Sequence, residues 1–234
     1  MSDITQGGPE LAKKIDHTLL KPEARAKDYE RLCNEAMAHG FFSVCVPPTY
    51  VPLARKLLRN SEVKVCTVIG FPHGLNDSPT KVFELQRAFD CGADEFDVVM
   101  NISALKSGDE RAVRNELSSL VKAAQGKTVK VIIETSLLTD EEKVKACQAA
   151  EDSGAHFVKT STGFAGGGAT VADIQLLKKT IHTKMQIKAS GGIRDLATAL
   201  AMLEAGATRL GTSQGIAIVS GEPSTSPSQE KSVY

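Results

Sequence analysis

Short apolar runs alternate with amphipathic stretches along almost the whole chain. Runs of a few residues rich in Val, Ile, Phe and Cys are typical of buried strands, and apolar residues spaced three or four apart indicate helices. Strands are predicted at 16–20, 42–46, 64–69, 95–99, 129–134, 185–189 and 209–213, and another opens at Phe157. Helices are predicted at 11–15, 29–39, 51–59, from Pro79 to about 91, 110–124, 139–154, 171–181, 196–205 and 214–219.

Eight strands that alternate with helices predict a single-domain α/β protein with the (β/α)8 TIM-barrel fold. Gly and Ala recur together between a helix and the next strand, at 92–93, 154–155 and 206–207, as expected for repeated units. A doubly wound open sheet is the alternative, but no GxGxxG motif follows the first strand. We therefore expect a leader over 1–10, a barrel over 11–220 and a flexible Ser/Pro-rich tail over 221–234.

Composition narrows the function classes. The 28 basic residues balance 28 acidic ones among 234 residues, and no basic block supports nucleic-acid or membrane binding. Five spread cysteines without a CxxC pair predict a cytoplasmic protein rather than a disulfide framework or a zinc site. The five histidines do not cluster, so the spacing indicates no metal site. We expect no secretory signal segment, because no charged-then-apolar stretch opens the sequence.

The most informative polar residues are two lysines, each placed just before the end of an apolar strand. Lys159 follows Phe157 and Val158, and Lys188 follows Ile187 in the next strand. If both point into the barrel, like charge and desolvation favour loss of a proton from one of them. A neutral lysine can attack a carbonyl carbon and form a Schiff base. The alternative, that one or both lysines face the helices and extend toward water, is about equally supported.

Asp97 lies between Phe96 and Val98, so strand alternation places it on the face opposite to these two apolar residues. A buried acid there needs a cationic partner, and Lys159 and Lys188 are the candidates. It would transfer protons or hold the two lysines. A purely structural ion pair is comparably well supported.

Active sites of barrels lie at the carboxyl ends of the strands, which draws attention to further polar residues. Asp16 and Thr18 lie in the first strand and Cys45 in the second, although an inert buried thiol is the simpler reading of Cys45. Barrel phosphate sites are frequently built after the seventh and eighth strands. The residues placed there are Gly191, Gly192, Gly211, Thr212 and Ser213.

Six segments together resemble the deoxyribose-phosphate aldolase family, in the order in which that family has them. They are DHTLL at 16–20, EFDVVMN at 95–101, VIIET at 131–135, FVKTSTG at 157–163, KASGGI at 188–193 and GTS at 211–213. The resemblance spans roughly residues 11–220, and six ordered matches make it specific.

This resemblance implies a class I aldolase on a TIM barrel, without a metal or other cofactor. The implied reaction is the reversible cleavage of 2-deoxy-D-ribose 5-phosphate to D-glyceraldehyde 3-phosphate and acetaldehyde. Lys159 matches the Schiff-base lysine, Lys188 the second lysine that tunes it, and Asp97 the acid that moves protons. The implied substrate contacts include Thr162 and Gly163, together with the glycine turns after the seventh and eighth strands.

Two features bear on how closely the family pattern applies. Some members have a lysine after Ser-Thr-Gly that meets phosphate, but this chain has Phe164, which weakens the expectation of tight phosphate selectivity. Some members also reach the site with a C-terminal tyrosine, and this chain ends in Tyr234. Other Schiff-base sugar-phosphate aldolases, transaldolases and non-catalytic phosphosugar-binding barrels remain alternatives. The partners are small phosphosugars and aldehydes, and the outer helices permit a homodimer without specifying one.

Overall fold

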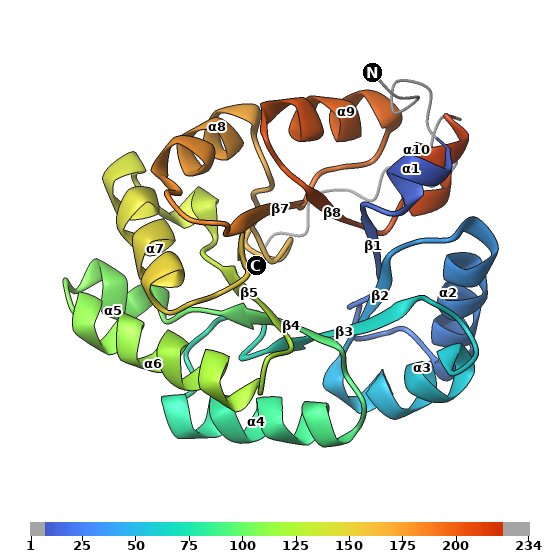
Figure 1. Cartoon of the computed structure of the whole chain (residues 1–234), viewed down its shortest axis with the longest axis horizontal. Helices are drawn as coiled ribbons and strands as arrows, with labels where there is room; N and C mark the ends of the chain where they lie inside the picture. Colours follow the sequence, from blue (N-terminus) through green and yellow to red (C-terminus); the bar gives the residue numbers. More distant parts are fainter. Residues whose placement is uncertain (1–7, 222–234) are drawn as a thin grey trace.

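A computed structural model describes residues 8–221 of the chain, which form a closed barrel of eight strands inside a ring of helices (Figure 1). The strands follow one another around the barrel in chain order, and every neighbouring pair is parallel. They are β1 Ile15–Thr18, β2 Ser43–Val46, β3 Lys64–Ile69, β4 Glu95–Val99, β5 Thr128–Ile132, β6 Phe157–Lys159, β7 Gln186–Ser190 and β8 Arg209–Thr212. The predicted TIM barrel is therefore confirmed.

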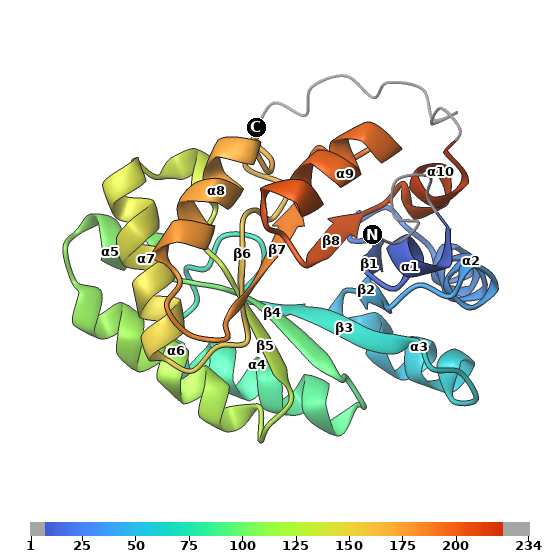
Figure 2. The ribbon, with the colours of Figure 1, turned by 45° about the horizontal axis from the view of Figure 1, so that its top comes forward.

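The helices lie outside the strands, as the tilted view also shows (Figure 2). They are α1 Pro9–Ala12, α2 Ala26–His39, α3 Val51–Leu58, α4 Ser78–Asp90, α5 Ile102–Lys106, α6 Glu110–Ala123, α7 Asp140–Asp152, α8 Val171–Thr180, α9 Leu196–Ala205 and α10 Gly215–Ser220. Short 3-10 turns add η2 Pro48–Tyr50 and η3 Thr135–Leu137. Among these described helices, none has the length and apolarity needed to cross a bilayer.

Strand alternation divides the apolar side chains into two clusters. Helix-facing residues such as Val65, Phe96, Val131 and Val158 belong to the large core between the barrel and its helices. Inside the barrel, the separate buried apolar cluster consists only of Cys45, Cys66 and Val68. Buried charged residues occupy further inward-facing positions, including Asp97, Lys130 and Lys188.

Local signals in the sequence explain where several helices begin and end. Thr139 and Glu142 form the predicted capping box at the start of α7, with each side chain bonded to the other's backbone N–H. The Asp77 side chain caps the start of α4. The helix was predicted to start at Pro79, close to this cap. Gly40 ends α2 in the left-handed conformation that glycine adopts without steric cost.

The structure differs from the predicted elements in a few places. β5 ends at Ile132, so Glu134 lies beyond the strand, with a left-handed φ of 53°. The short helix α5 was not predicted, because its five residues give too little periodicity. α1 begins at Pro9, two residues before the expected start. The predicted leader and tail lie mostly outside the described residues, and Tyr234 lies wholly outside them.

Candidate active site

In the described part of the chain, seven charged side chains meet inside the barrel and are linked by ion pairs. Three are carboxylates and four are cations, and all of them are buried: Asp16, Glu95, Asp97, Lys130, Lys159, Lys188 and Arg209. Strand alternation brings them together, because they come from β1, β4, β5, β6, β7 and β8. This connected set carries one more positive than negative charge when every group is ionised. Loss of one proton from a lysine would make it neutral.

Asp97 lies at the centre of this network. Its Oδ2 accepts hydrogen bonds from Lys159 Nζ at 2.8 Å and Lys188 Nζ at 2.7 Å, and its Oδ1 accepts one from Lys130 Nζ at 2.8 Å. Burial by itself would raise the pKa of Asp97, but the three ammonium groups outweigh it and hold the pKa well below the ordinary value. Asp97 is therefore ionised and shared by three lysines. The predicted pairing of Asp97 with Lys159 and Lys188 is present.

The lysines differ in how many carboxylates each one contacts. Lys188 Nζ bonds to Asp16 and Asp97, and Lys130 Nζ lies 2.7 Å from Glu95 and 2.8 Å from Asp97. Burial lowers the pKa of Lys188, but these two carboxylates raise it above its ordinary value. Lys159 pairs with Asp97 alone among the described residues. Lys159 is thus the least compensated cation of the set.

The register of the strands places Lys159 beside Lys188. These two residues are direct partners between β6 and β7, and Lys159 is the last residue of its strand. The carboxyl ends of the strands form the catalytic face of TIM barrels. Asp16 lies deeper in the network, where Arg209 Nη1 and Ser43 Oγ donate to its Oδ1 at 2.8 and 2.7 Å.

The predicted substrate contacts in the first two strands are engaged within the protein. Asp16 is fully buried, and its carboxylate is occupied by the network. Thr18 donates its hydroxyl to the carbonyl oxygen of Asp16 at 2.9 Å. Cys45 is fully buried and neighbours Cys66 inside the barrel. Contact of these residues with substrate remains a prediction.

Glycines of the predicted phosphate turns adopt conformations that favour glycine. Gly163, Gly191 and Gly192 have φ values of 85°, 84° and 78°. A side chain on Gly163 or Gly192 would meet no atom within 4 Å, so the backbone faces open space there. The Ser161 and Ser190 hydroxyls are buried and have no hydrogen-bond partner within residues 8–221. Free hydroxyl donors beside open glycine turns suit an anion.

Strand β8 requires one correction to the predicted turns. Gly211 lies within β8, and a Cβ there would be 2.3 Å from Ser190 Oγ and 3.0 Å from Lys188 Cε. Gly211 therefore makes room for the Ser190 and Lys188 side chains from within the strand, and its contact with phosphate stays a prediction. Thr212 donates its hydroxyl to Ile193 O at 2.7 Å, whereas Ser213 follows the strand and is exposed.

Thr162 is held by Glu134, a residue that the predicted site did not include. Glu134 accepts hydrogen bonds from both the backbone N–H and the hydroxyl of Thr162. Lys130, Glu95 and Arg209 were also absent from the predicted site, although their sequence pattern was visible. Each is a charged residue in an apolar strand, at a position whose side chain points into the barrel.

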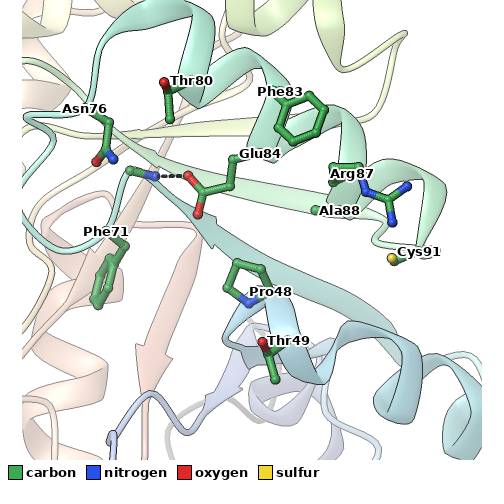
Figure 3. A pocket seen from close by; sticks show the side chains of 11 residues that line it. Pro48, Thr49, Phe71, Asn76, Thr80, Phe83, Glu84, Arg87, Ala88 and Cys91 are labelled. Atoms are coloured by element: carbon green, nitrogen blue, oxygen red, sulfur yellow. Dashed lines mark hydrogen bonds between the residues drawn. The ribbon is translucent and has the colours of Figure 1, made fainter.

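Phe164 lies next to the glycine turn after β6, and its side chain is 47% exposed. Its ring meets that of Phe71 edge to face, with centroids 5.2 Å apart. Phe71 also borders a hollow of about 480 Å³ beside α4, whose lining includes Phe83 and Glu84 (Figure 3). Glu84 Oε2 accepts a hydrogen bond from the Gly70 N–H at 2.8 Å, which anchors the loop that carries Phe71.

Comparison with known proteins places this chain among aldolases. The model of the DeoC/LacD family aldolase matches residues 11–221. A deoxyribose-phosphate aldolase of Bdellovibrio bacteriovorus is 55% identical over 212 residues, which cover 91% of this chain and 96% of that protein. The corresponding enzyme of Dictyoglomus turgidum is 53% identical over 91% of this chain and 97% of its own length.

Solved structures with the same fold lead to the same family. The deoxyribose phosphate aldolase of Aeropyrum pernix, described as tetrameric, has a TM-score of 0.84 and 36% identity, over 93% of this chain and 95% of that one. A protein described as QR15, an aldolase, has a TM-score of 0.86 and 44% identity, over 89% and 94% of the two chains. The buried lysine network therefore belongs to a chain that is a member of the DeoC/LacD aldolase family.

Proposed function

We propose that this protein reversibly cleaves 2-deoxy-D-ribose 5-phosphate to D-glyceraldehyde 3-phosphate and acetaldehyde through a Schiff base on Lys159. The observation that carries the proposal is the unequal pairing of the interior lysines: Lys159 contacts one carboxylate, whereas Lys130 and Lys188 each contact more than one. Attack on a carbonyl carbon requires a lysine amine that can leave its carboxylate, and Lys159 has a single carboxylate to leave. The names of the relatives support the choice of substrate.

The chemistry begins with attack of the neutral Lys159 amine on the aldehyde carbon C1 of the open-chain sugar. Loss of water gives an iminium ion, which withdraws electrons from the adjacent carbons. The C2–C3 bond then breaks, its electron pair forms an enamine with the former iminium, and the 3-hydroxyl group loses its proton as C3 becomes the product aldehyde. Protonation of the enamine carbon and hydrolysis release acetaldehyde and restore Lys159.

Proton transfer in this scheme falls to Asp97 and Lys188. Their hydrogen bond of 2.7 Å lets a proton pass between them and on to a water or the substrate oxygen. The raised pKa of Lys188 and the lowered pKa of Asp97 make the ion pair the resting form. In this resting form Lys188 carries the proton and is the donor. Once Lys188 has given up its proton, Asp97 can accept one.

Binding of the substrate phosphate is assigned to the turns after β6 and β7. Gly163, Gly191 and Gly192 offer backbone N–H groups, and the buried hydroxyls of Ser161 and Ser190 add donors. Remote binding of this kind positions the reacting carbon. Thr162 and Ser213 complete the proposed contacts, with Thr18, Cys45 and Asp16 lining the reactive end. A contact from Tyr234 remains a prediction.

The decisive experiment traps the imine. The protein is incubated with acetaldehyde and cyanoborohydride, and the modified lysines are mapped by mass spectrometry. We expect the adduct on Lys159. Lys81 is the internal control, because it is also fully buried but pairs with Glu116 outside the barrel interior. An adduct on Lys188 in place of Lys159 would reverse the assignment, and the absence of any adduct would refute a Schiff-base aldolase.

Donor profiling separates the alternatives. A deoxyribose-phosphate aldolase uses acetaldehyde as the donor, whereas a transaldolase or ketose-phosphate aldolase uses dihydroxyacetone-type donors. A non-catalytic phosphosugar-binding barrel would bind phosphosugar without turnover. The proposal also includes a cytoplasmic location, supported by five cysteines that form no disulfide. It includes a homodimer, which light scattering of the purified protein tests.

A further inference from the structure

Two thiols lie side by side inside the barrel, next to the proposed catalytic residues. Cys45 on β2 and Cys66 on β3 are direct register partners, and both are fully buried. They form a small interior cluster with Val68, against which Leu20 and Phe71 pack. Leu20 follows β1 and Phe71 follows β3, so the cluster is approached from the carboxyl ends of the strands. The proposed reaction uses neither thiol in a bond-making step.

A carboxylate completes a potential set of ligands. Cys66 Sγ donates a hydrogen bond to Asp97 Oδ1 at 3.2 Å. One donor atom each from Cys45, Cys66 and Asp97 lie within 4.8 Å of one another. Two sulfur ligands and one oxygen ligand at such separations match what a tetrahedral thiophilic ion requires, with a fourth position left for water. The sequence could not show this set, because the three residues lie on three strands.

We propose that Cys45, Cys66 and Asp97 form a binding site for a thiophilic divalent cation of the zinc and cadmium class, and that occupation of this site inhibits the enzyme. Binding replaces two thiol protons by one dication, so two protons leave and the interior charge is unchanged. The thiols bind the ion as thiolates. No oxidant or reductant takes part.

The surrounding charges select for this class of ion. The interior network already has one cation in excess, so an ion that displaced no protons would raise the positive charge further. Magnesium and calcium prefer oxygen ligands and do not release thiol protons. Lys130 Nζ lies 3.3 Å from Cys66 Sγ and can donate to the thiolate that forms. The pocket therefore disfavours hard cations and accepts thiophilic ones.

Inhibition follows from the position of Asp97. The ion would take Oδ1 of Asp97, the oxygen to which Lys130 now donates. Asp97 also accepts hydrogen bonds from Lys159 and Lys188 through Oδ2. Movement or neutralisation of Asp97 therefore weakens the hydrogen bonds that hold both lysines. This consequence rests on the proposed aldolase function, whereas ion binding does not. Binding is therefore measured by readouts that are independent of turnover.

The test titrates the full-length protein with Cd²⁺ and records thiolate-to-cadmium absorbance in the ultraviolet together with proton release. We expect one ion per chain with two protons released, and no response to Mg²⁺. Cys45→Ala and Cys66→Ala should each weaken binding by more than about 100-fold, since even outer-shell partners of metal sites are worth about 10- to 100-fold. Cys147→Ala is the matched control, because Cys147 is buried but lies on α7.

Three results would overturn the proposal. The first is tight Cd²⁺ binding without the thiolate band, or with fewer than two protons released. This result needs only the wild-type protein and no variant. The second is equal response to Mg²⁺. The third is affinity lost in Cys66→Ala but kept in Cys45→Ala, which would place the ion on the neighbouring set of Asp16, Cys66 and Glu95. Loss of cadmium inhibition in Cys45→Ala, relative to that variant's own uninhibited rate, would support the inhibitory role.

Discussion

Replacing Lys188 by Met tests the electrostatic basis of the proposed mechanism. The change keeps an unbranched side chain of similar length and removes one buried positive charge from beside Lys159. The remaining connected set would hold three cations and three carboxylates. Lys159 would then lose the repulsion from a neighbouring ammonium group, and its attack on the carbonyl carbon should slow.

The size of the effect follows from the shared oxygen. Lys159 Nζ and Lys188 Nζ lie 2.8 and 2.7 Å from Oδ2 of Asp97, which places the two nitrogens about 4–5 Å apart by ordinary hydrogen-bond geometry. Two unit charges at that distance repel by about 3–4 kcal/mol at an effective dielectric constant of about 20. That energy corresponds to about a 100- to 1,000-fold change in an equilibrium constant. Water that enters the space left by Lys188 reduces this factor.

The assay measures the rate of imine formation with acetaldehyde from pH 5 to pH 10 by rapid quench with cyanoborohydride. We expect the pH of half-maximal rate to rise in Lys188→Met. Lys81→Met is the matched control, because Lys81 is a fully buried lysine whose Nζ lies 2.7 Å from Glu116. Both variants break a buried ion pair and should lose about 3–5 kcal/mol of stability. Lys81→Met should keep the wild-type pH profile.

An unchanged profile in folded Lys188→Met would refute tuning by like charge. An equal shift in Lys81→Met would also refute it, because the shift would then report a general loss of stability. Thermal unfolding of both variants at each pH separates these outcomes from simple denaturation.

Three further predictions test the network and the mouth of the barrel. Gly211→Ala places a Cβ 2.3 Å from Ser190 Oγ. It should cost about 1–3 kcal/mol of stability in urea unfolding and most of the turnover in steady-state kinetics. Wild-type values would contradict the assigned role of Gly211. The pKa of Asp16 is lowered because Lys188, Lys130 and Arg209 outweigh its burial. Its contribution to stability is therefore complete above the unfolded-state pKa of about 4 and is lost as the pH falls below it. The deficit of Asp16→Asn in urea unfolding should be largest at pH 7 and should shrink toward pH 2, and a pH-independent deficit would argue against ionic stabilisation. Phe164→Lys should lower the KM for the phosphorylated aldehyde without changing kcat for acetaldehyde condensation, and an unchanged KM would place the phosphate away from Phe164.

The sequence by itself determined the barrel and the chemical types of the central residues. Alternating strand and helix patterns require repeated β–α units, and the bounds of β3, β4 and α9 were predicted to the residue. A lysine or aspartate between apolar neighbours in a strand must point away from them, because successive side chains alternate between faces. That local rule was enough to nominate Lys159, Lys188 and Asp97.

The tertiary structure alone decided how those charges are distributed. Lys130, Glu95 and Arg209 follow the same alternation, but only closure of the barrel brings them against Asp97 and Asp16. The unequal carboxylate pairing that sets Lys159 apart depends on distances across strands far apart in the sequence. The same holds for the thiols, because Cys45 and Cys66 meet Asp97 only through strand register. Spacing along a chain fixes which face a side chain occupies, whereas electrostatic interactions depend on the distances that folding creates.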